Sequence, residues 1–192
     1  MNLLHRWYCN SSGWAEGLQR DIIPSTLGDA DLGDNVLEIG PGPGMSTEWL
    51  MSRVPLMTAI EVDHKLADSL KQRMQDTNVT VVEGDATDMP FPDGSFSAAV
   101  CFTMLHHVPS VELQDRLLAQ AHRVLRTGAL FLGSDSTPSL RWRLFHVFDT
   151  CVAVHPPAFG TRLEAAGFTD VDVDWNRQYN SFRFRARKGS GG

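Results

Sequence analysis

Three glycines, Gly40, Gly42 and Gly44, stand at alternate positions directly after the apolar run of residues 35–39. Glycine lets a chain turn sharply and lets a ligand approach the backbone closely, because it has no Cβ. In open α/β sheets such a loop lies at the carboxyl edge, where ligands bind. Glu61 ends the next apolar run, about 20 positions after Gly40, which is the spacing at which a carboxylate binds the ribose hydroxyls of an adenosine cofactor. The pattern predicts a site for a ligand that contains adenosine.

The residues around the glycines narrow the class of ligand. The dinucleotide fingerprint requires glycine or alanine at its sixth position, where this chain has Met45. The chain contains no G-x-x-x-x-G-K-[ST] sequence, which excludes the ordinary P-loop nucleotide site. Glu38 precedes the loop, and its negative charge would repel a phosphate but attract a cation. These features favour a positively charged nucleoside over NAD or a nucleotide.

The segment from Glu38 to Gly44 resembles the first motif, acid-x-G-x-G-x-G, of the class I S-adenosylmethionine-dependent methyltransferases. The resemblance is strong over about residues 34–134 and weak over the rest of the chain. Within the family, the chain is most similar to the small-molecule, type 11-like members. The resemblance implies that the glycine loop lies against the methionyl part of the cofactor. Glu38 is expected to attract the cationic groups of that part, and backbone N–H groups near Gly42 to Gly44 to bind its carboxylate.

The same resemblance predicts which residues bind the ribose and the adenine of the cofactor. Glu61, together with the adjacent Val62, is expected to bind both ribose hydroxyls. Asp85, together with the adjacent Ala86, follows the third predicted strand and is expected to accept the adenine amino group. Thr103 opens the segment after the fourth strand that faces cofactor and substrate in this family. The implied cofactor is S-adenosylmethionine, with S-adenosylhomocysteine as its product.

His106 and His107 follow Thr103 and are the candidate catalytic residues. One of them could act as a general base, because an unperturbed imidazole titrates near neutral pH. A packing or turn role is the alternative for both. Methyl transfer is an in-line displacement, so holding the acceptor close to the methyl carbon supplies much of the acceleration without a covalent enzyme nucleophile. The sequence shows no metal-ligand spacing, and no metal is predicted.

Apolar runs that alternate with helical periodicity predict the elements that position these residues. Two further strands, at 168–175 and 179–187, are separated by three residues, which is too short for a parallel crossover and predicts an antiparallel pair. The expected fold is an α/β, Rossmann-like, doubly wound sheet of seven strands, mostly parallel with an antiparallel C-terminal hairpin. The other predicted strands are residues 35–39, 57–62, 79–83, 96–102 and 129–133, and the helices between them are 45–54, 65–75 and 111–126.

The length of 192 residues fits one domain. We predict a single methyltransferase domain over residues 1–188, with an N-terminal helical cap over 1–33 and a cofactor-binding core over 34–134. Residues 135–188 would form a lid helix and the closing strands, and 189–192 a flexible tail. Pro156 and Pro157 are expected to stop the lid helix. Two groups of aromatic residues are candidates for covering the pocket, with ordinary packing as the alternative: Trp7, Tyr8 and Trp14, and Trp142, Phe145 and Phe148.

The acidic composition indicates which class of molecule accepts the methyl group. The net charge of −6 weakens the case for a protein that binds nucleic acid through many phosphate contacts. Residues 59–63 resemble the rRNA adenine dimethyltransferases, but the Asn-x-x-aromatic signature that grips a flipped base in that family is replaced by residues 102–105 here. We therefore expect a small-molecule acceptor and no stable nucleic-acid partner. A non-catalytic protein that binds S-adenosylmethionine remains an alternative, and an RNA methyltransferase is a weaker one.

Cysteine usage and hydropathy predict a cytoplasmic location. The three cysteines, Cys9, Cys101 and Cys151, lie far apart, which favours reduced thiols. No run of about 18 apolar residues predicts a transmembrane segment, and the first residues lack the apolar core of a secretory signal. Arg183, Arg185 and Arg187 would share one strand face and form a solvated sheet edge.

Overall fold

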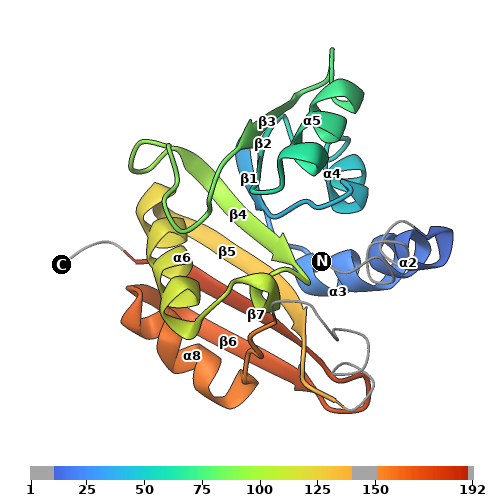
Figure 1. The fold of residues 1–192 in the computed structure, drawn as a ribbon. Helices are drawn as coiled ribbons and strands as arrows, with labels where there is room; N and C mark the ends of the chain where they lie inside the picture. The colour runs from blue at the N-terminus through green and yellow to red at the C-terminus, as the bar shows by residue number, and fades with distance from the viewer. Residues whose placement is uncertain (1–10, 140–150, 190–192) are drawn as a thin grey trace.

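The computed structural model describes residues 11–139 and 151–189. Seven strands form one sheet in the order β3-β2-β1-β4-β5-β7-β6 (Figure 1). The first five are parallel, whereas β7 runs antiparallel to both β5 and β6. The predicted mixed sheet with an antiparallel C-terminal pair is confirmed. The strands are β1 Asn35–Ile39, β2 Leu56–Glu61, β3 Val79–Glu83, β4 Phe96–Phe102, β5 Leu125–Ser136, β6 Phe168–Asn176 and β7 Ser181–Lys188.

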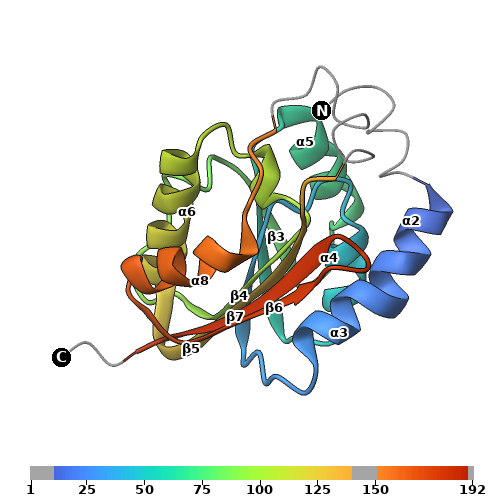
Figure 2. The same ribbon diagram turned by 90° about the horizontal axis from the view of Figure 1, so that it is seen from below.

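Helices cover both faces of the sheet (Figure 2). Side chains alternate across a strand, so Leu37 of β1 packs with α6 on one face while Val36 packs on the other face with the helices that precede β1. The face of α6 also carries α8, and the opposite face carries α2, α3, α4 and α5. The helices are α2 Ser12–Gly17, the π-helical η1 Leu18–Ile22, α3 Ile23–Leu27, α4 Met45–Leu50, α5 His64–Arg73, the 3₁₀ turn η2 Leu105–His107, α6 Val111–Val124 and α8 Pro156–Ala165.

Local capping fixes where two of these helices begin. The Asp63 carboxylate accepts the N–H groups of Lys65 and Leu66 at 2.9 and 3.1 Å and starts α5. The Ser110 hydroxyl accepts the N–H of Leu113 and starts α6. Because Asp63 comes two residues after Glu61, this cap also fixes the end of β2 beside the predicted cofactor site. In the described ranges, every helix is too short or too polar to cross a lipid bilayer.

The segment around residue 156 differs from the prediction. Pro156 and Pro157 open the helix α8 instead of only ending an earlier one, because proline tolerates the first helical turn, where its missing N–H needs no partner. No helix was predicted there. The lid helix predicted from Leu140 to Cys151 falls on residues 140–150, outside the described residues, and Cys151 itself lies in a loop. Trp7, Tyr8, Trp142, Phe145 and Phe148 are likewise outside them, while Trp14 is half-buried in α2.

The junction between α6 and β5 also differs. The predicted helix 111–126 ends at Val124, because Leu125 already pairs with Phe96 of β4. The strand predicted as 129–133 spans 125–136, with a register shift on β4 between Phe96 and Ala98. Strand β5 therefore extends beyond Gly133 to Ser136, and this places the Asp135 carboxylate at the carboxyl edge of the sheet.

The arginine face of β7 is not a sheet edge. Strand β7 lies between β5 and β6, so β6 is the edge strand at this end, and the predicted position of the arginines is wrong. Arg183 forms an ion pair with Asp174 of β6, and Arg187 forms one with Asp170 at 3.3 Å. The cross-strand register places Arg185 opposite Asp172. These arginines face acidic partners across the sheet and do not form an open basic surface.

Candidate functional site

The segments predicted to bind a cofactor meet at the carboxyl edge of the sheet. Strands β1, β2 and β3 are neighbours, so the loops that follow them lie side by side (Figure 1). The N–H of Gly40 donates to the carbonyl of Ile60, and the N–H of Gly84 donates to the carbonyl of Glu61, both at 2.9 Å. The glycine loop, Glu61 and the Asp85 segment therefore belong to one continuous site.

The glycine loop is shaped by its backbone conformation. Gly42 has a φ of 55°, which residues with a side chain rarely adopt. Among residues 11–139 and 151–189, no atom lies within 4 Å of a Cβ placed on Gly42. At Gly40, which has a φ of 68°, a Cβ would lie 2.9 Å from Cε of Met104. The loop therefore lies against the segment after β4 at Gly40, and its backbone at Gly42 is not covered by any of the described residues.

Glu61 is bound to the glycine loop. Its side chain is almost fully buried, and Oε2 accepts the N–H of Gly42 at 2.9 Å while Oε1 accepts the N–H of Asp63 at 3.0 Å. The N–H of Gly44 donates to the carbonyl of Pro41 at 2.9 Å. These two N–H groups therefore already donate within the chain, and the expectation that backbone N–H groups near Gly42 to Gly44 bind a cofactor carboxylate stays a prediction. Each oxygen of Glu61 retains a lone pair for a ligand hydroxyl.

Glu38 lies beneath the loop and not at its surface. Only 1% of the residue is exposed, Oε2 accepts the hydroxyl of Thr47 at 2.5 Å, and Oε1 accepts the hydroxyl of Ser46. Both hydroxyls belong to the first turn of α4. Glu38 thus fastens the end of β1 to the helix that follows the loop. Burial raises the pKa of this carboxyl group to about 7, partly opposed by the two hydroxyl donors and increased by the negative charge of Glu61.

This raised pKa predicts a pH-dependent stability. The carboxyl group has an ordinary pKa near 4.5, so its stabilising contribution is complete below about pH 4.5 and is lost as the pH rises through about 7. We expect the free energy of unfolding of the wild type to fall by roughly 2 to 3 kcal/mol relative to Glu38→Gln between pH 4.5 and 8. Urea unfolding of both proteins without ligand measures this difference. Parallel pH curves for the two proteins would show that Glu38 is not a buried titrating group.

Asp85, Val62 and Ala86 are more accessible to solvent than Glu38 and Glu61. The Asp85 side chain is exposed, and its Oδ1 accepts the N–H of Thr87 at 2.8 Å, which forms a tight turn after β3. Val62 is 70% exposed, and Ala86 is half-buried against the core. These three residues line the outer side of the site, where the flat faces of a nucleoside could contact Val62 and Ala86.

Thr103 has a strained backbone. Its φ is 52°, which is unusual for a β-branched residue, and its N–H donates to the carbonyl of Ser134 at 2.7 Å. Such strain is found at sites where the surrounding structure imposes an unfavourable conformation. The turn at Thr103 directs the chain from β4 into η2, which carries His106 and His107.

His106 forms a buried pair with Asp135, a residue that sequence reasoning missed. The ring Nδ1 lies 2.5 Å from Oδ1 of Asp135, and the backbone N–H of His106 donates to Oδ2 at 3.0 Å. The exposed fractions of the two residues are 3% and 1%. The available signal was that Asp135 follows the predicted strand 129–133 closely, and the structure places that strand beside β4, so the acid reaches residues that follow β4.

His107 is half-buried and lies beside Cys151. Its Nδ1 is 3.8 Å from Sγ of Cys151, and its ring centroid is 4.1 Å from that of His106. One potential ligand atom from each of these three residues lies within 4.8 Å of the others, so they could hold a metal ion. Imidazole and thiolate ligands suit zinc. No local sequence pattern indicates this grouping, because Cys151 is 44 residues away from His107 along the chain.

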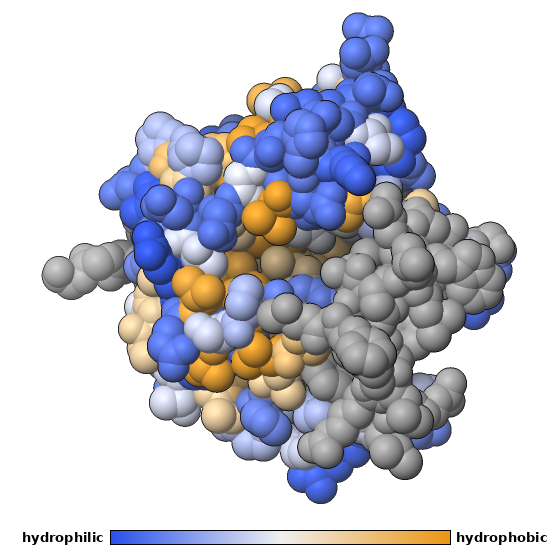
Figure 3. Space-filling view, viewed as in Figure 1, coloured by the Kyte–Doolittle hydropathy of each residue, from blue (hydrophilic) through white to orange (hydrophobic). Residues whose placement is uncertain are grey.

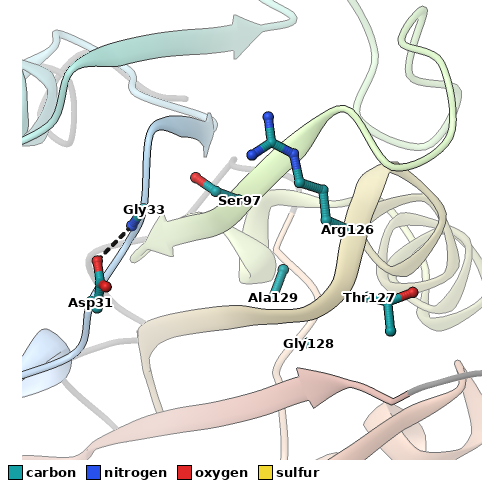
Figure 4. Close-up of a pocket in the computed structure, with 7 residues that line it drawn as sticks. All are labelled: Asp31, Gly33, Ser97, Arg126, Thr127, Gly128 and Ala129. Carbon is teal, nitrogen blue, oxygen red and sulfur yellow. Dashed lines mark hydrogen bonds between the residues drawn. The ribbon is translucent and has the colours of Figure 1, made fainter.

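A shallow pocket lies at the amino ends of the strands, away from the glycine loop (Figure 4). This shallow pocket has a volume of about 260 Å³ and is lined by the segment before β1 and the first residues of β4 and β5. Asp31 accepts the N–H of Gly33 there. Because ligands of open α/β sheets bind at the carboxyl ends of the strands, this pocket at the amino ends is not the predicted site. Its lining residues are Asp31, Gly33, Ser97, Arg126, Thr127, Gly128 and Ala129.

The chain matches the family model described as "Methyltransferase domain" over residues 37–133. It is 32% identical over 120 residues to the fatty-acid O-methyltransferase of Mycolicibacterium smegmatis, covering 61% of this chain and 43% of that protein. It is 36% identical over 110 residues to the probable ribosomal RNA small subunit methyltransferase A of Haloarcula marismortui, covering 55% and 37%. The chain spans less than half the length of these two relatives.

Solved structures share the fold. A SAM-dependent methyltransferase from Aquifex aeolicus superposes with a TM-score of 0.76 at 18% identity, over 98% of this chain and 99% of that chain. The Haemonchus contortus phosphoethanolamine N-methyltransferase 2 in complex with S-adenosyl-L-methionine gives 0.75 at 14% identity, over 97% and 60%. A chain from the complex between the Haloferax volcanii Trm112 methyltransferase activator and the putative methyltransferase gives 0.74 at 13% identity, over 99% of both chains.

Proposed function

Because this chain belongs to the methyltransferase domain family, we propose that it transfers a methyl group from S-adenosylmethionine to a small molecule in the cytoplasm. The observation that carries the proposal is the buried Glu61 carboxylate, hydrogen-bonded to a glycine loop in which a Cβ on Gly42 would meet no atom of the described residues within 4 Å. On this proposal residues 1–188 act as one domain, in which 34–134 hold the cofactor and 1–33 and 135–188 cover the acceptor.

The donors and acceptors at the carboxyl edge fit this cofactor. Glu61 would accept both ribose hydroxyls, because a carboxylate is an acceptor with lone pairs to spare beyond its two backbone donors. Asp85 would accept the adenine amino group, and the backbone at Gly42, which no described residue covers, would lie against the methionyl part. Val62 and Ala86 would flank the nucleoside. When bound, S-adenosylmethionine supplies an electrophilic methyl group on a positively charged sulfur.

Two further residues would shape this pocket. Thr103 would form its floor through the strained turn after β4. Glu38 would act from below, since its carboxyl group holds α4 in place and becomes more easily ionised when a positive charge binds above it. Gly40 and Gly44 would maintain the shape of the loop. On the face viewed in Figure 1, apolar side chains gather around a hollow between the β1–β3 part and the α6 part of the molecule, which is where an acceptor would lie (Figure 3).

The charge distribution supports a small acceptor over RNA. The chain carries a net charge of −6, and arginines of β7 that could have formed a basic surface are paired with acids of β6. Binding to an RNA backbone needs several unpaired cations. The relatives nevertheless include both a fatty-acid and a ribosomal RNA methyltransferase, so RNA belongs among the acceptors tested.

Two measurements test the proposal. Calorimetric titration should give heat with S-adenosylhomocysteine and none with NAD. Transfer of a labelled methyl group should then be assayed against phenols, alcohols, amines, thiols, carboxylic acids, lipid head groups and a ribosomal RNA fragment. Micromolar binding of S-adenosylhomocysteine with no transfer to any acceptor would favour a non-catalytic binding protein, and transfer to RNA alone would replace the small-molecule acceptor.

Asp85→Ala should weaken S-adenosylhomocysteine binding by about 1 kcal/mol, roughly fivefold. The effect is modest because the Asp85 side chain is exposed and competes with water for the adenine amino group. Calorimetric titration of the variant measures it. The matched control is Asp88→Ala, three residues later on the same loop and exposed, which should leave affinity unchanged. Equal affinities of the wild type and Asp85→Ala would remove Asp85 from the adenine site.

A further inference from the structure

A buried glutamine of α6 joins two chain segments on the acceptor side of the proposed site. Gln114 is fully buried, and its Nε2 donates to the backbone carbonyls of Leu105 and Val152 at 3.1 and 3.0 Å. Its Oε1 accepts a hydrogen bond from Nη1 of Arg162 in α8 at 3.0 Å. One side chain therefore links α6, the turn η2, the loop before α8 and α8 itself.

The partners of Gln114 determine the orientation of its amide group. A guanidinium group only donates hydrogen bonds, and a backbone carbonyl only accepts them. The opposite orientation would place the amide NH₂ against Arg162 and the amide oxygen against two carbonyl oxygens. Both Nε2 protons and a lone pair of Oε1 are therefore used, and a buried network that is satisfied in this way makes the groups that it joins rigid.

The two segments that Gln114 joins are also bonded directly to each other. The N–H of Val152 donates to the carbonyl of His106 at 2.8 Å. Leu105 and His106 belong to η2, which follows the strained turn at Thr103. The backbone bond and the two amide bonds of Gln114 therefore hold Val152 against the turn that follows β4.

Burial alone does not account for a glutamine at this position. An amide loses its contacts with water on burial, so it is tolerated only where its polar atoms are paired. An apolar side chain would avoid this cost, but it would not fix η2 against Val152. The polar side chain of Gln114 therefore contributes position as well as packing. The other buried residues of α6 are apolar: Leu117, Leu118, Ala121 and Val124.

Arg162 holds the amide of Gln114 from the side of α8. Its Nε donates to Asp115 at 2.6 Å, and its Nη2 donates to the carbonyl of Val111 at 3.2 Å. Only 17% of the Arg162 side chain is exposed. The first two turns of α6 and the helix α8 therefore form a rigid support for the amide. Within the described residues, none of these hydrogen bonds reaches the glycine loop or Glu61.

We propose that Gln114 is a positioning residue for methyl transfer, which holds η2 and Val152 together on the acceptor side of the site and has no part in binding the cofactor. This inference rests on the proposed function, in which residues 135–188 cover the acceptor and the segment after β4 faces it. A shift of about 1 Å between the acceptor and the methyl group slows an in-line transfer by up to roughly 100-fold. Loss of the two Gln114 donors should therefore slow transfer while the cofactor still binds.

The first test needs no acceptor and measures cysteine alkylation by iodoacetamide, with S-adenosylhomocysteine present and peptides identified by mass spectrometry. Gln114→Glu keeps the size of the side chain and its contact with Arg162, but turns an oxygen toward the two carbonyls. Cys151, next to Val152, should react roughly 10-fold faster in this variant, because its loop opens locally. Cys101, buried in β4, should react as slowly as in the wild type.

Two results of this test would overturn the proposal. An unchanged rate at Cys151 would mean that Gln114 does not hold Val152 in place. Equal acceleration at Cys151 and Cys101 would mean that the substitution loosens the whole fold. Gln114→Met removes both donors without adding a charge, and it takes the place of Gln114→Glu if that variant fails to fold.

The second test separates transfer from cofactor binding. For the acceptor that the wild type methylates fastest, Gln114→Glu should lower kcat by roughly 30-fold, with the affinity for S-adenosylhomocysteine within about twofold of the wild type. The matched control is Gln120→Met on the same helix, whose Oε1 accepts the N–H of Met89 and Nε of Arg123 at 3.3 and 3.2 Å. This control should keep the wild-type kcat.

The outcomes separate the inference from the proposed function. An unchanged kcat in Gln114→Glu would overturn the inference alone, and so would a loss of S-adenosylhomocysteine affinity as large as the loss of kcat. No transfer by the wild type to any acceptor would remove the proposed function and the inference together.

Discussion

Glu61→Ala is expected to weaken S-adenosylhomocysteine binding by about 3 kcal/mol, roughly 150-fold. The variant removes an acceptor for two ribose hydroxyls from a site that is only 6% exposed, where a lost partner is not replaced easily by water. It also removes the acceptor of the Gly42 N–H, so the glycine loop loses its contact with the end of β2. Both losses act on the same ligand, which makes this the most damaging single change in the cofactor site.

Calorimetric titration measures this loss of affinity for S-adenosylhomocysteine. Two further variants serve as a control and as an intermediate case. Glu83→Ala changes the last residue of the neighbouring strand β3, whose exposed carboxylate contacts His64, and should leave affinity unchanged. Glu61→Gln keeps an oxygen acceptor for Gly42 but removes the charge and one acceptor, so its affinity should fall between those of the wild type and Glu61→Ala. If Glu61→Ala bound S-adenosylhomocysteine as tightly as the wild type, the assigned cofactor site would be wrong.

Gly133→Ala is expected to lower the free energy of unfolding by about 3 kcal/mol or more. Gly133 lies in the middle of β5 and is paired with Cys101 of β4. A Cβ at this position would lie 2.5 Å from the backbone carbonyl oxygen of Cys101 and 2.6 Å from the ring of Phe184. The ring could move slightly, but the carbonyl is held in the sheet, so the strands must separate.

Urea unfolding measures this change, with Gly160→Ala as the matched control. Gly160 lies within α8, and a Cβ there would meet its nearest atom at 3.7 Å, which is ordinary contact. Alanine favours a helix over glycine, so this control should be neutral or more stable by up to about 1 kcal/mol. Stability of Gly133→Ala equal to that of the wild type would mean that β4 and β5 do not approach each other as described.

The separation of β4 and β5 in Gly133→Ala would also disturb the His106–Asp135 pair, because Asp135 lies two residues beyond Gly133. This gives an independent check on the tertiary contact. The imidazole ¹⁵N signals of His106 in folded Gly133→Ala should therefore differ from those of the wild type, because the contact with Asp135 is lengthened or lost.

The sequence predicted the secondary structure well where periodicity was strong and local. Strands β1, β3 and β4 have the predicted bounds. The apolar runs of β1 and β4 are buried on both faces, and the edge strand β3 alternates buried and exposed residues. The prediction missed α8, because the pair of prolines was interpreted only as the end of a helix, although proline also begins one. It was also wrong about the edge position of β7, since the spacing of two strands does not show which of them pairs with the rest of the sheet.

The sequence by itself determined the order of the elements, the glycine loop and the position of Glu61, because each depends on residue types within one strand and the turn after it. Only the tertiary structure decided that Glu38 is buried beneath Ser46 and Thr47, and that His106 is paired with Asp135. The last pair joins residues 29 positions apart and depends on the register that places Phe102 of β4 beside Ser134 of β5. That register is fixed by the packing of side chains on both faces of the sheet, which no local pattern specifies.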